Sequence, residues 1–220
     1  MTSNFDERLC RVGFRLAGWG PPEPHKAGAP DLEATLLEIL ECIHEDGRLL
    51  SLLVSWIKVH GAYVNVEKLR KLSRKASEQA NIWLSAMAGF AIAHQMPKWK
   101  TLARRQPEPR YFYPPEVADG AIAMKGAIPW LEKLNFRIPN GSIRIRETDV
   151  LSPEELAKVH RQYRNRYLYG PSWRADIITA VEEGARTPTE VVKKVGCSYE
   201  PAHRVLRELK VASAKRIRPA

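Results

Sequence analysis

The chain has 220 residues, 44% hydrophobic and 27% charged, so its composition indicates a folded globular protein and excludes a disordered chain or a membrane protein. Its 35 Lys and Arg residues outnumber 25 Asp and Glu, and the formal net charge of +10 favours a polyanionic partner such as nucleic acid. No apolar run approaches the roughly 18 residues that a membrane-spanning helix needs, and the N-terminus lacks the pattern of a secretory signal. We therefore expect a cytoplasmic protein without a membrane contact.

The three cysteines indicate neither a disulfide framework nor a zinc site. Cys10, Cys42 and Cys197 lie far apart, and Cys42 and His44 have no second ligand pair at a suitable spacing. A cluster of Glu41, His44, Glu45 and Asp46 is typical of a solvated helix end rather than of a metal or acid-base site. We expect no metal and no cofactor.

Residues 1–30 predict a flexible arm, because they contain four glycines and four prolines, which support neither helix nor strand. Residues 31–96 predict a helical domain. Asp31 is suited to cap its first helix, in which apolar residues recur at helical spacing while the opposite face is acidic. That acidic face, within residues 31–46, cannot lie on DNA, so we expect it to face solvent or a protein partner.

Three further helices are predicted in this domain. The second begins near Leu49 and ends at His60 and Gly61, the third is capped by Asn65, and the fourth covers residues 77–94. The order of the last three suits either a degenerate helix-turn-helix or an ordinary helical bundle.

Residues 97–115 predict a basic, aromatic linker. Its cations include four candidate phosphate contacts, and its aromatic rings suit either stacking on bases or, as we favour, packing on neighbouring domains. The four candidates are Lys98, Lys100, Arg104 and Arg105.

Residues 116–170 predict a helical connector with one short strand, residues 142–147. They also predict a helix over residues 152–167 that opens with a capping box of Ser152 and Glu155.

Residues 171–220 predict three helices in the order of a helix-turn-helix. Ser172 is suited to cap the first, and Gly184 ends it. Thr187, Pro188 and Glu190 form a strong start for the second. Gly196 and the small residue Cys197 suit the tight turn that two steeply crossing helices need. Ser198 then caps a third helix.

The third helix is the candidate for reading DNA, because the N-terminal part of such a helix enters the major groove. Its inward positions are Ala202, Val205, Leu206 and Leu209. The residues left for DNA are Ser198, Tyr199, Glu200, His203, Arg204 and Arg207, together with Lys215, Arg216 and Arg218 of the tail, where a wing hairpin or a basic extension would lie. Arg204 is the best candidate for a bidentate bond to guanine.

The segment RADIITAVEEGARTPTEVVKKVGCSYEPAHRVLREL resembles the winged helix-turn-helix of bacterial transcriptional regulators of the arsenic-repressor and multiple-antibiotic-resistance type. The resemblance covers less than a quarter of the chain, and the rest resembles no family that we can name. It implies a DNA-facing role for Ser198, Tyr199, His203, Arg204 and Arg207. The cysteine pairs of metal-sensing repressors are absent from the sequence, which argues against metal sensing.

We therefore expect a mainly α protein with at most a short hairpin, which binds double-stranded DNA sequence-specifically as a transcriptional regulator and forms a homodimer. The sequence contains no Gly-rich phosphate loop, nucleophile elbow or His-Glu metal helix, so we do not expect an enzyme. The alternative is a protein-binding regulator, such as an antitoxin or an accessory subunit of a mobile-element or phage-defence system, whose N-terminal helical domain holds a protein partner. Three-helix units also serve as docking modules that make no nucleic-acid contact.

Overall fold

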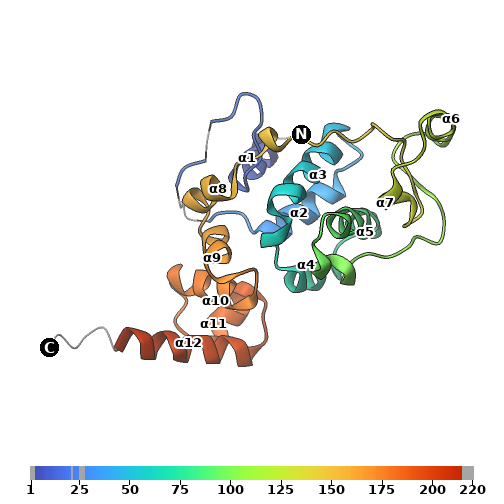
Figure 1. The fold of residues 1–220 in the computed structure, drawn as a ribbon. Helices are drawn as coiled ribbons and strands as arrows, with labels where there is room; N and C mark the ends of the chain where they lie inside the picture. Colours follow the sequence, from blue (N-terminus) through green and yellow to red (C-terminus); the bar gives the residue numbers. More distant parts are fainter. Residues whose placement is uncertain (1–2, 21, 25–27, 215–220) are drawn as a thin grey trace.

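The structure is a computed structural model that describes residues 3–20, 22–24 and 28–214. It is mainly α-helical, as the sequence predicts (Figure 1). The N-terminal helices are α1 (Ser3–Arg11), α2 (Leu32–Glu41), α3 (Arg48–His60), α4 (Val66–Ser73) and α5 (Glu78–Ala93), with a short 3-10 helix, η1 (Gly61–Tyr63), before α4. The middle of the chain holds η2 (Pro97–Thr101), α6 (Pro115–Lys125), α7 (Pro129–Glu132), η3 (Glu147–Asp149), α8 (Pro153–Val159) and α9 (Arg161–Tyr169). The last three helices are α10 (Trp173–Glu182), α11 (Pro188–Val195) and α12 (Tyr199–Ala214).

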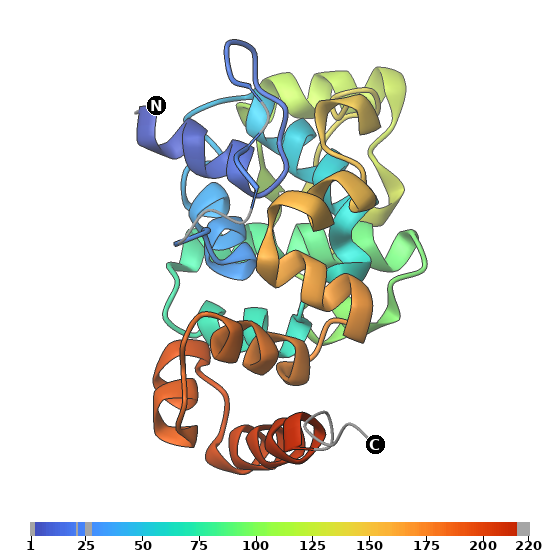
Figure 2. The ribbon, with the colours of Figure 1, turned by 90° about the vertical axis from the view of Figure 1, so that its left-hand side faces the viewer.

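Within the described residues, the one sheet consists of two short parallel strands, β1 (Arg110–Tyr111) and β2 (Phe136–Arg137). Arg110 lies opposite Phe136 in this pair. The fold therefore depends on helix packing, and the buried apolar side chains form two separate clusters, one in residues 5–163 and one in residues 177–206. We call residues 3–169 the main body and residues 171–214 the C-terminal unit; they are stacked in Figure 2, with the C-terminal unit below.

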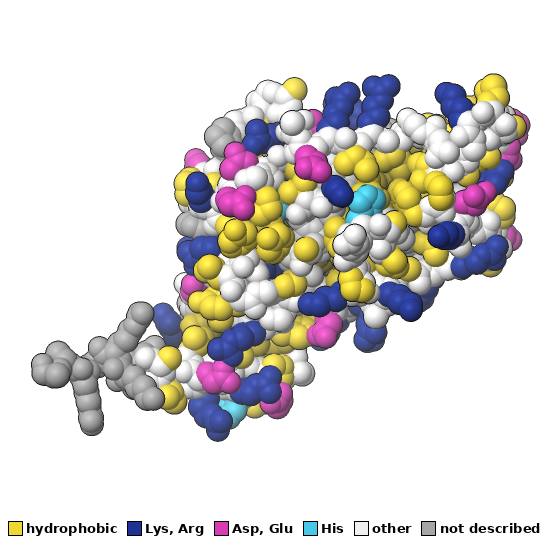
Figure 3. All heavy atoms as spheres, viewed as in Figure 1, with side chains coloured by type: hydrophobic (Ala, Val, Ile, Leu, Met, Phe, Trp, Pro, Cys, Tyr) yellow, Lys and Arg dark blue, Asp and Glu magenta, His cyan; other side chains and the backbone are white. Residues whose placement is uncertain are grey.

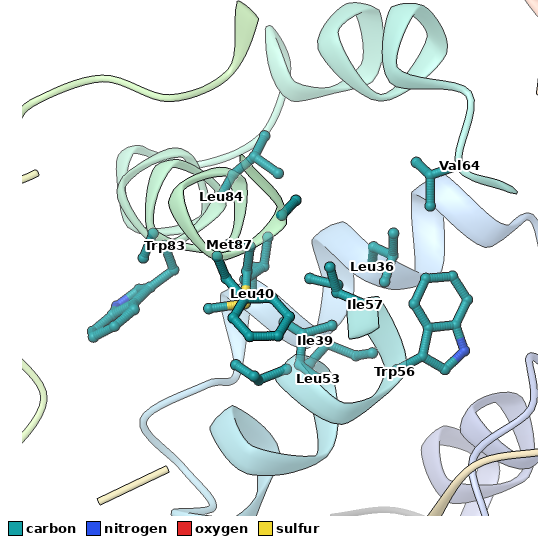
Figure 4. Close-up of a cluster of buried hydrophobic side chains, with 14 of the residues drawn as sticks. Leu36, Ile39, Leu40, Leu53, Trp56, Ile57, Val64, Trp83, Leu84 and Met87 are labelled. Carbon is teal, nitrogen blue, oxygen red and sulfur yellow. The ribbon is translucent and has the colours of Figure 1, made fainter. Parts of the chain in front are cut away.

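The core of the main body lies between α2, α3 and α5. Leu36 and Ile39 of α2, Leu53 and Ile57 of α3 and Met87 of α5 gather in one space (Figure 4), and each is almost completely buried. Full burial of one such side chain stabilises the fold by about 1.5 to 3 kcal/mol. α4 packs on α2, and η2 packs on α5 and α4. The core thereby positions the surface against which the C-terminal unit packs.

The predicted helix starts in residues 31–96 are confirmed by their capping bonds. Side-chain oxygens of Asp31, Asn65 and Ser77 each accept from the backbone N–H three residues later. Such bonds satisfy amide groups that a helix leaves unpaired in its first turn, so these positions mark a start from local chemistry alone. The capping box of Ser152 and Glu155 is also present, at the start of α8.

The prediction of a flexible arm over residues 1–30 is wrong for residues 3–14. They form α1 and a short extension, and Leu9, Val12 and Phe14 are buried in the core of the main body. The indole Nε1 of Trp56 donates to the Val12 carbonyl oxygen at 2.8 Å, and Phe14 forms a bridge with Val150. The helix is possible because no glycine precedes Gly13 and no proline precedes Pro21.

Residues 142–147 form no strand, contrary to the prediction. Their backbone runs along α3, where the N–H groups of Arg144 and Arg146 donate to the hydroxyls of Ser51 and Ser55 at 3.2 and 2.9 Å. Side-chain acceptors thus replace a partner strand. The helix predicted over residues 152–167 is interrupted at His160, whose extended backbone separates α8 from α9 and whose Nδ1 accepts from the N–H of Tyr163.

The aromatic rings of residues 97–115 pack on the main body, which is the role that we favoured for them. Trp99 is buried and donates from Nε1 to the Gly61 carbonyl oxygen at 3.1 Å. Phe112 stacks on His44, with ring centroids 5.2 Å apart, and His44 also accepts a hydrogen bond from Trp83. These contacts hold the segment to the core and leave its cations on the surface.

Candidate nucleic-acid interface

The turn between α11 and α12 is built by local sequence signals. Thr187 caps α11 by accepting from the N–H of Glu190, and Pro188 occupies the first helical position. Gly196 ends α11 with a φ of 81°, in the left-handed region that a side chain makes costly. A Cβ atom at Gly196 would meet nothing within 4 Å, so the backbone conformation, rather than space, requires glycine there.

The inward face of α12 agrees with the predicted one. Ala202, Val205 and Leu206 are buried in the cluster of the C-terminal unit, where they pack with Ile177 of α10 and Val191 of α11. The candidate DNA-facing residues within the described chain, namely Ser198, Tyr199, Glu200, His203, Arg204 and Arg207, are all exposed. The three helices therefore present one polar face of α12 to solvent.

The exposed side chains of α12 form two contacts with one another. The Arg204 guanidinium lies 3.5 Å from the Glu200 carboxylate, and the rings of Tyr199 and His203 stack with centroids 6.1 Å apart. An exposed ion pair one helical turn apart contributes only about 0.3 to 0.5 kcal/mol. Arg204 can therefore leave Glu200 for a stronger acceptor at little cost.

The C-terminal unit holds no strand among its described residues. α12 continues from Tyr199 to Ala214, so residues 211–214, the start of the tail that we assigned to a wing or a basic extension, are helical. The reason is local, because no glycine or proline follows Pro201 until Pro219. Lys215, Arg216 and Arg218 lie outside the described residues.

At the other end of the unit, Ser172 occupies the predicted cap position of α10, but its side chain makes no capping bond. The unit is instead anchored through α10, whose Asp176 is buried against α9. Gly184 follows the end of α10, as predicted, with a φ of 101°.

A buried ionic cluster joins the C-terminal unit to the main body. Arg166 of α9 is fully buried between two carboxylates, with Nη2 2.7 Å from Oδ1 of Asp176 and 2.7 Å from Oε2 of Glu33. Asn65 donates to both acids, from Nδ2 to Asp176 at 2.8 Å and from its backbone N–H to Glu33 at 2.9 Å. The four side chains come from α2, the α4 cap, α9 and α10, so the cluster fixes the unit's position.

The charges in this cluster are compensated. Burial acts to lower the pKa of Arg166, but the carboxylates of Glu33 and Asp176 outweigh that effect and raise it, so the guanidinium stays charged. Lys68 of α4 pairs with Asp31 and lies 3.6 Å from Glu33. Burial acts to lower the pKa of Lys68 as well, but the carboxylates of Glu33 and Asp31 outweigh that effect. The pKa of Lys68 therefore lies above its ordinary value.

The acidic face of α2 meets solvent in part, as we expected: Glu41 is exposed and Glu38 keeps 43% of its side chain exposed, whereas Glu33 is buried. Glu33 belongs to the buried cluster, Glu38 pairs with Arg8 of α1, and Glu41 accepts from the N–H and hydroxyl of Ser77. The contacts come from Arg8 of α1, Arg166 of α9 and Ser77 at the cap of α5. The sequence pattern gave no sign of these contacts because they join residues far apart in the chain.

The four predicted phosphate contacts of the linker are exposed on the main body. Lys98 and Arg104 each line one of two neighbouring hollows beside α4, whereas Lys100 and Arg105 line neither. α4 itself was predicted, but its cations were not among the candidate site residues; of these, Lys71 donates from Nζ to the Gly196 carbonyl oxygen at the turn before α12. The run KLRKLSRK, residues 68–75, was the available signal, because it holds five cations and no acid.

Comparison of the chain with protein-family models, with curated proteins and with solved structures gave no match. The resemblance of the C-terminal segment to winged helix-turn-helix regulators thus depends on its own residues. Among the helices that the structure describes, none has the length and apolar character needed to cross a membrane.

Proposed function

We propose that this protein binds double-stranded DNA sequence-specifically, through the exposed face at the N-terminal half of α12, and acts as a transcriptional regulator. The observation that carries the proposal is the turn at Gly196, which ends α11 and presents Arg204 and its neighbours outward from a three-helix unit with its own core. A helix of about 10 to 12 Å diameter fits the major groove, which is about 12 Å wide.

The proposed roles follow from side-chain chemistry. Arg204 donates two hydrogen bonds to guanine, and Glu200, released from Arg204, accepts from cytosine N4. Ser198 and Tyr199, at the start of α12, contact phosphate, where the helix N-terminus also favours an anion. His203 and Arg207 continue the same exposed face along the helix.

The rest of the reading interface differs from the winged pattern. α12 continues as a helix to Ala214, where the winged pattern would have a hairpin. Its C-terminal half, with exposed Lys210, therefore takes the place of the hairpin and extends the cationic surface. Lys215, Arg216 and Arg218 are proposed as further phosphate contacts. A regulator of this kind acts in the cytoplasm and binds a two-fold site as a homodimer.

The alternative of a protein-binding antitoxin or accessory subunit keeps only part of the acidic face of α2 as a contact surface, since Glu33 is buried within this chain whereas Glu41 is exposed. A three-helix docking module remains the competing role for the C-terminal unit. The cations exposed around α12 favour DNA over that role, because a protein-docking face is usually depleted of charge at its centre.

Fluorescence anisotropy with random-sequence duplex DNA, single-stranded DNA and RNA, each at 50 and 200 mM salt, tests the proposal. We expect the duplex to bind most tightly and its affinity to fall steeply with salt as counterions are released. Selection from a random duplex pool should then yield a preferred site. No duplex binding at 50 mM salt, or equal binding of all three nucleic acids, would refute the proposal.

A further inference from the structure

A cationic groove lies on the main body beside the start of α12. It consists of two neighbouring hollows of about 590 and 700 Å³ that share Arg70, Arg74 and Thr101 in their linings. We define the cationic groove by the six basic residues of both linings, which are Arg70, Lys71, Arg74, Lys98, Arg104 and Arg110. Two acids, Glu67 and Glu78, line it as well. The groove is therefore strongly positive.

Most cations of the groove are not neutralised by an acid of this chain. Among the described residues, Arg70, Arg74, Lys98 and Arg104 form no ion pair, and Arg110 lies 3.9 Å from the exposed carboxylate of Glu78. By contrast, the buried cations Lys68 and Arg166 are paired. The buried cations are thus neutralised by acids of the same chain, whereas the cations of the groove are available to an external anion.

The groove is continuous with the proposed reading helix. Residues 171–173, which lead into α10, line the hollow that also holds Lys71 and Lys98. Lys71 contacts the carbonyl of Gly196, two residues before Ser198, the residue that precedes α12. α12 begins at this end of the C-terminal unit and runs away from the main body (Figure 1). In Figure 3, Lys and Arg side chains gather along the lower edge of the molecule, on the C-terminal unit and on the underside of the main body next to it.

We propose that the cationic groove binds the phosphate backbone of the duplex that α12 reads, on the side that flanks the N-terminus of this helix. This inference depends on the proposed function. The partner is a polyanion rather than a small anion because the cations are distributed over two open hollows instead of converging on one point. The buried ionic cluster keeps the two surfaces in a fixed relation, so both can contact one duplex at once.

The test compares two triple variants with equal loss of charge. The groove variant is Arg70→Ala, Arg74→Ala and Lys98→Ala, and the control variant is Lys58→Ala, Arg144→Ala and Lys158→Ala, whose exposed side chains line neither hollow. Binding to the selected duplex is measured from 50 to 300 mM salt, with circular dichroism and thermal unfolding to confirm that both variants fold.

We expect the groove variant to lower the slope of log affinity against log salt by roughly 2 to 3, since each lost phosphate contact removes about 0.9. The control variant should change the slope by less than about 0.9, the value expected for the loss of one phosphate contact. With duplexes of increasing flank length, wild-type affinity should rise further than that of the groove variant. Equal slopes for the two variants would overturn the inference while leaving the proposed function standing; absence of duplex binding by the wild type would overturn the proposed function instead.

Discussion

The guanidinium of Arg166 and the carboxylate of Asp176 lie 2.7 Å apart with both side chains buried, and this pair links α9 of the main body to α10 of the C-terminal unit. Glu33 binds the other side of the same guanidinium. Any change in the pair therefore affects both the stability of the protein and the position of the proposed DNA-reading helix.

Arg166→Gln should destabilise the fold by about 3 to 5 kcal/mol, because it leaves the carboxylates of Glu33 and Asp176 buried without a compensating charge. The measurement is the free energy of unfolding from urea denaturation at pH 7. Arg164→Gln is the matched control on the same helix, since Arg164 pairs with Glu182 where both side chains are about one-third exposed, and it should cost at most about 1 kcal/mol. Similar losses for the two variants would contradict the role of Arg166.

Acid should destabilise the protein below pH 6.5 through two histidines. Burial lowers the pKa of His60 and of His160 to about 4. Nε2 of His160 donates to the Pro30 carbonyl oxygen at 3.0 Å while Nδ1 accepts from Tyr163, so the folded state holds the neutral ring. The unfolded chain takes up these protons near pH 6.5 and the folded chain only near 4, so stability is complete above 6.5 and falls between these values.

Each histidine should contribute a slope of about 1.4 kcal/mol per pH unit in that window. Urea denaturation at pH 7, 6 and 5 measures it, and His160→Asn should remove about half of the slope. The exposed His203 offers the control, because His203→Asn should leave the slope unchanged. An unfolding free energy that is constant from pH 7 to 5 would show that neither ring is held neutral.

Gly196→Val should abolish duplex binding even where the protein still folds. The left-handed φ of 81° costs a residue with a side chain about 1 to 2 kcal/mol, and relief of that strain moves the start of α12. Gly141→Val imposes the same strain at φ 82° on the main body, where a Cβ atom would also meet nothing within 4 Å. It should lower the melting temperature similarly but leave DNA affinity intact, whereas equal affinity for both variants would mean that the turn does not place α12.

The C-terminal unit could be predicted from the sequence because its signals are local. A cap at Thr187, a proline after it and a glycine at residue 196 act within one or two turns, and the apolar spacing of α12 fixes which face is buried. The outward direction of Arg204 followed from that spacing alone.

The buried ionic cluster could not be predicted, because its members are distant in the chain. Arg166 lies 133 residues from Glu33. The sequence of its own helix gives no sign that Arg166 is buried and indicates an ordinary solvent-exposed cation. The order of residues 3–14 was missed for a related reason: Leu9, Val12 and Phe14 are too few to form a core alone, and their segment contacts parts of the chain that are distant in sequence, such as Trp56 and Val150. The groove was missed because α4 and η2 meet only in the folded chain.

Arg204→Ala should reduce sequence discrimination more than general affinity. Its side chain is exposed beside Glu200 on a helix whose opposite face is buried, so in the proposed docking it reaches a base edge rather than phosphate. Loss of a bidentate contact to guanine should cost about 1 to 3 kcal/mol on the preferred site and little on random duplex. Lys193→Ala, an exposed cation on α11, is the control for charge alone and should weaken both duplexes to the same small extent. Affinities for the selected and the random duplex, measured at one salt concentration for variants with unchanged melting temperature, give the comparison. If Arg204→Ala lowers both affinities equally, this residue contacts the phosphate backbone, and the readout of sequence has to be assigned to another part of the molecule.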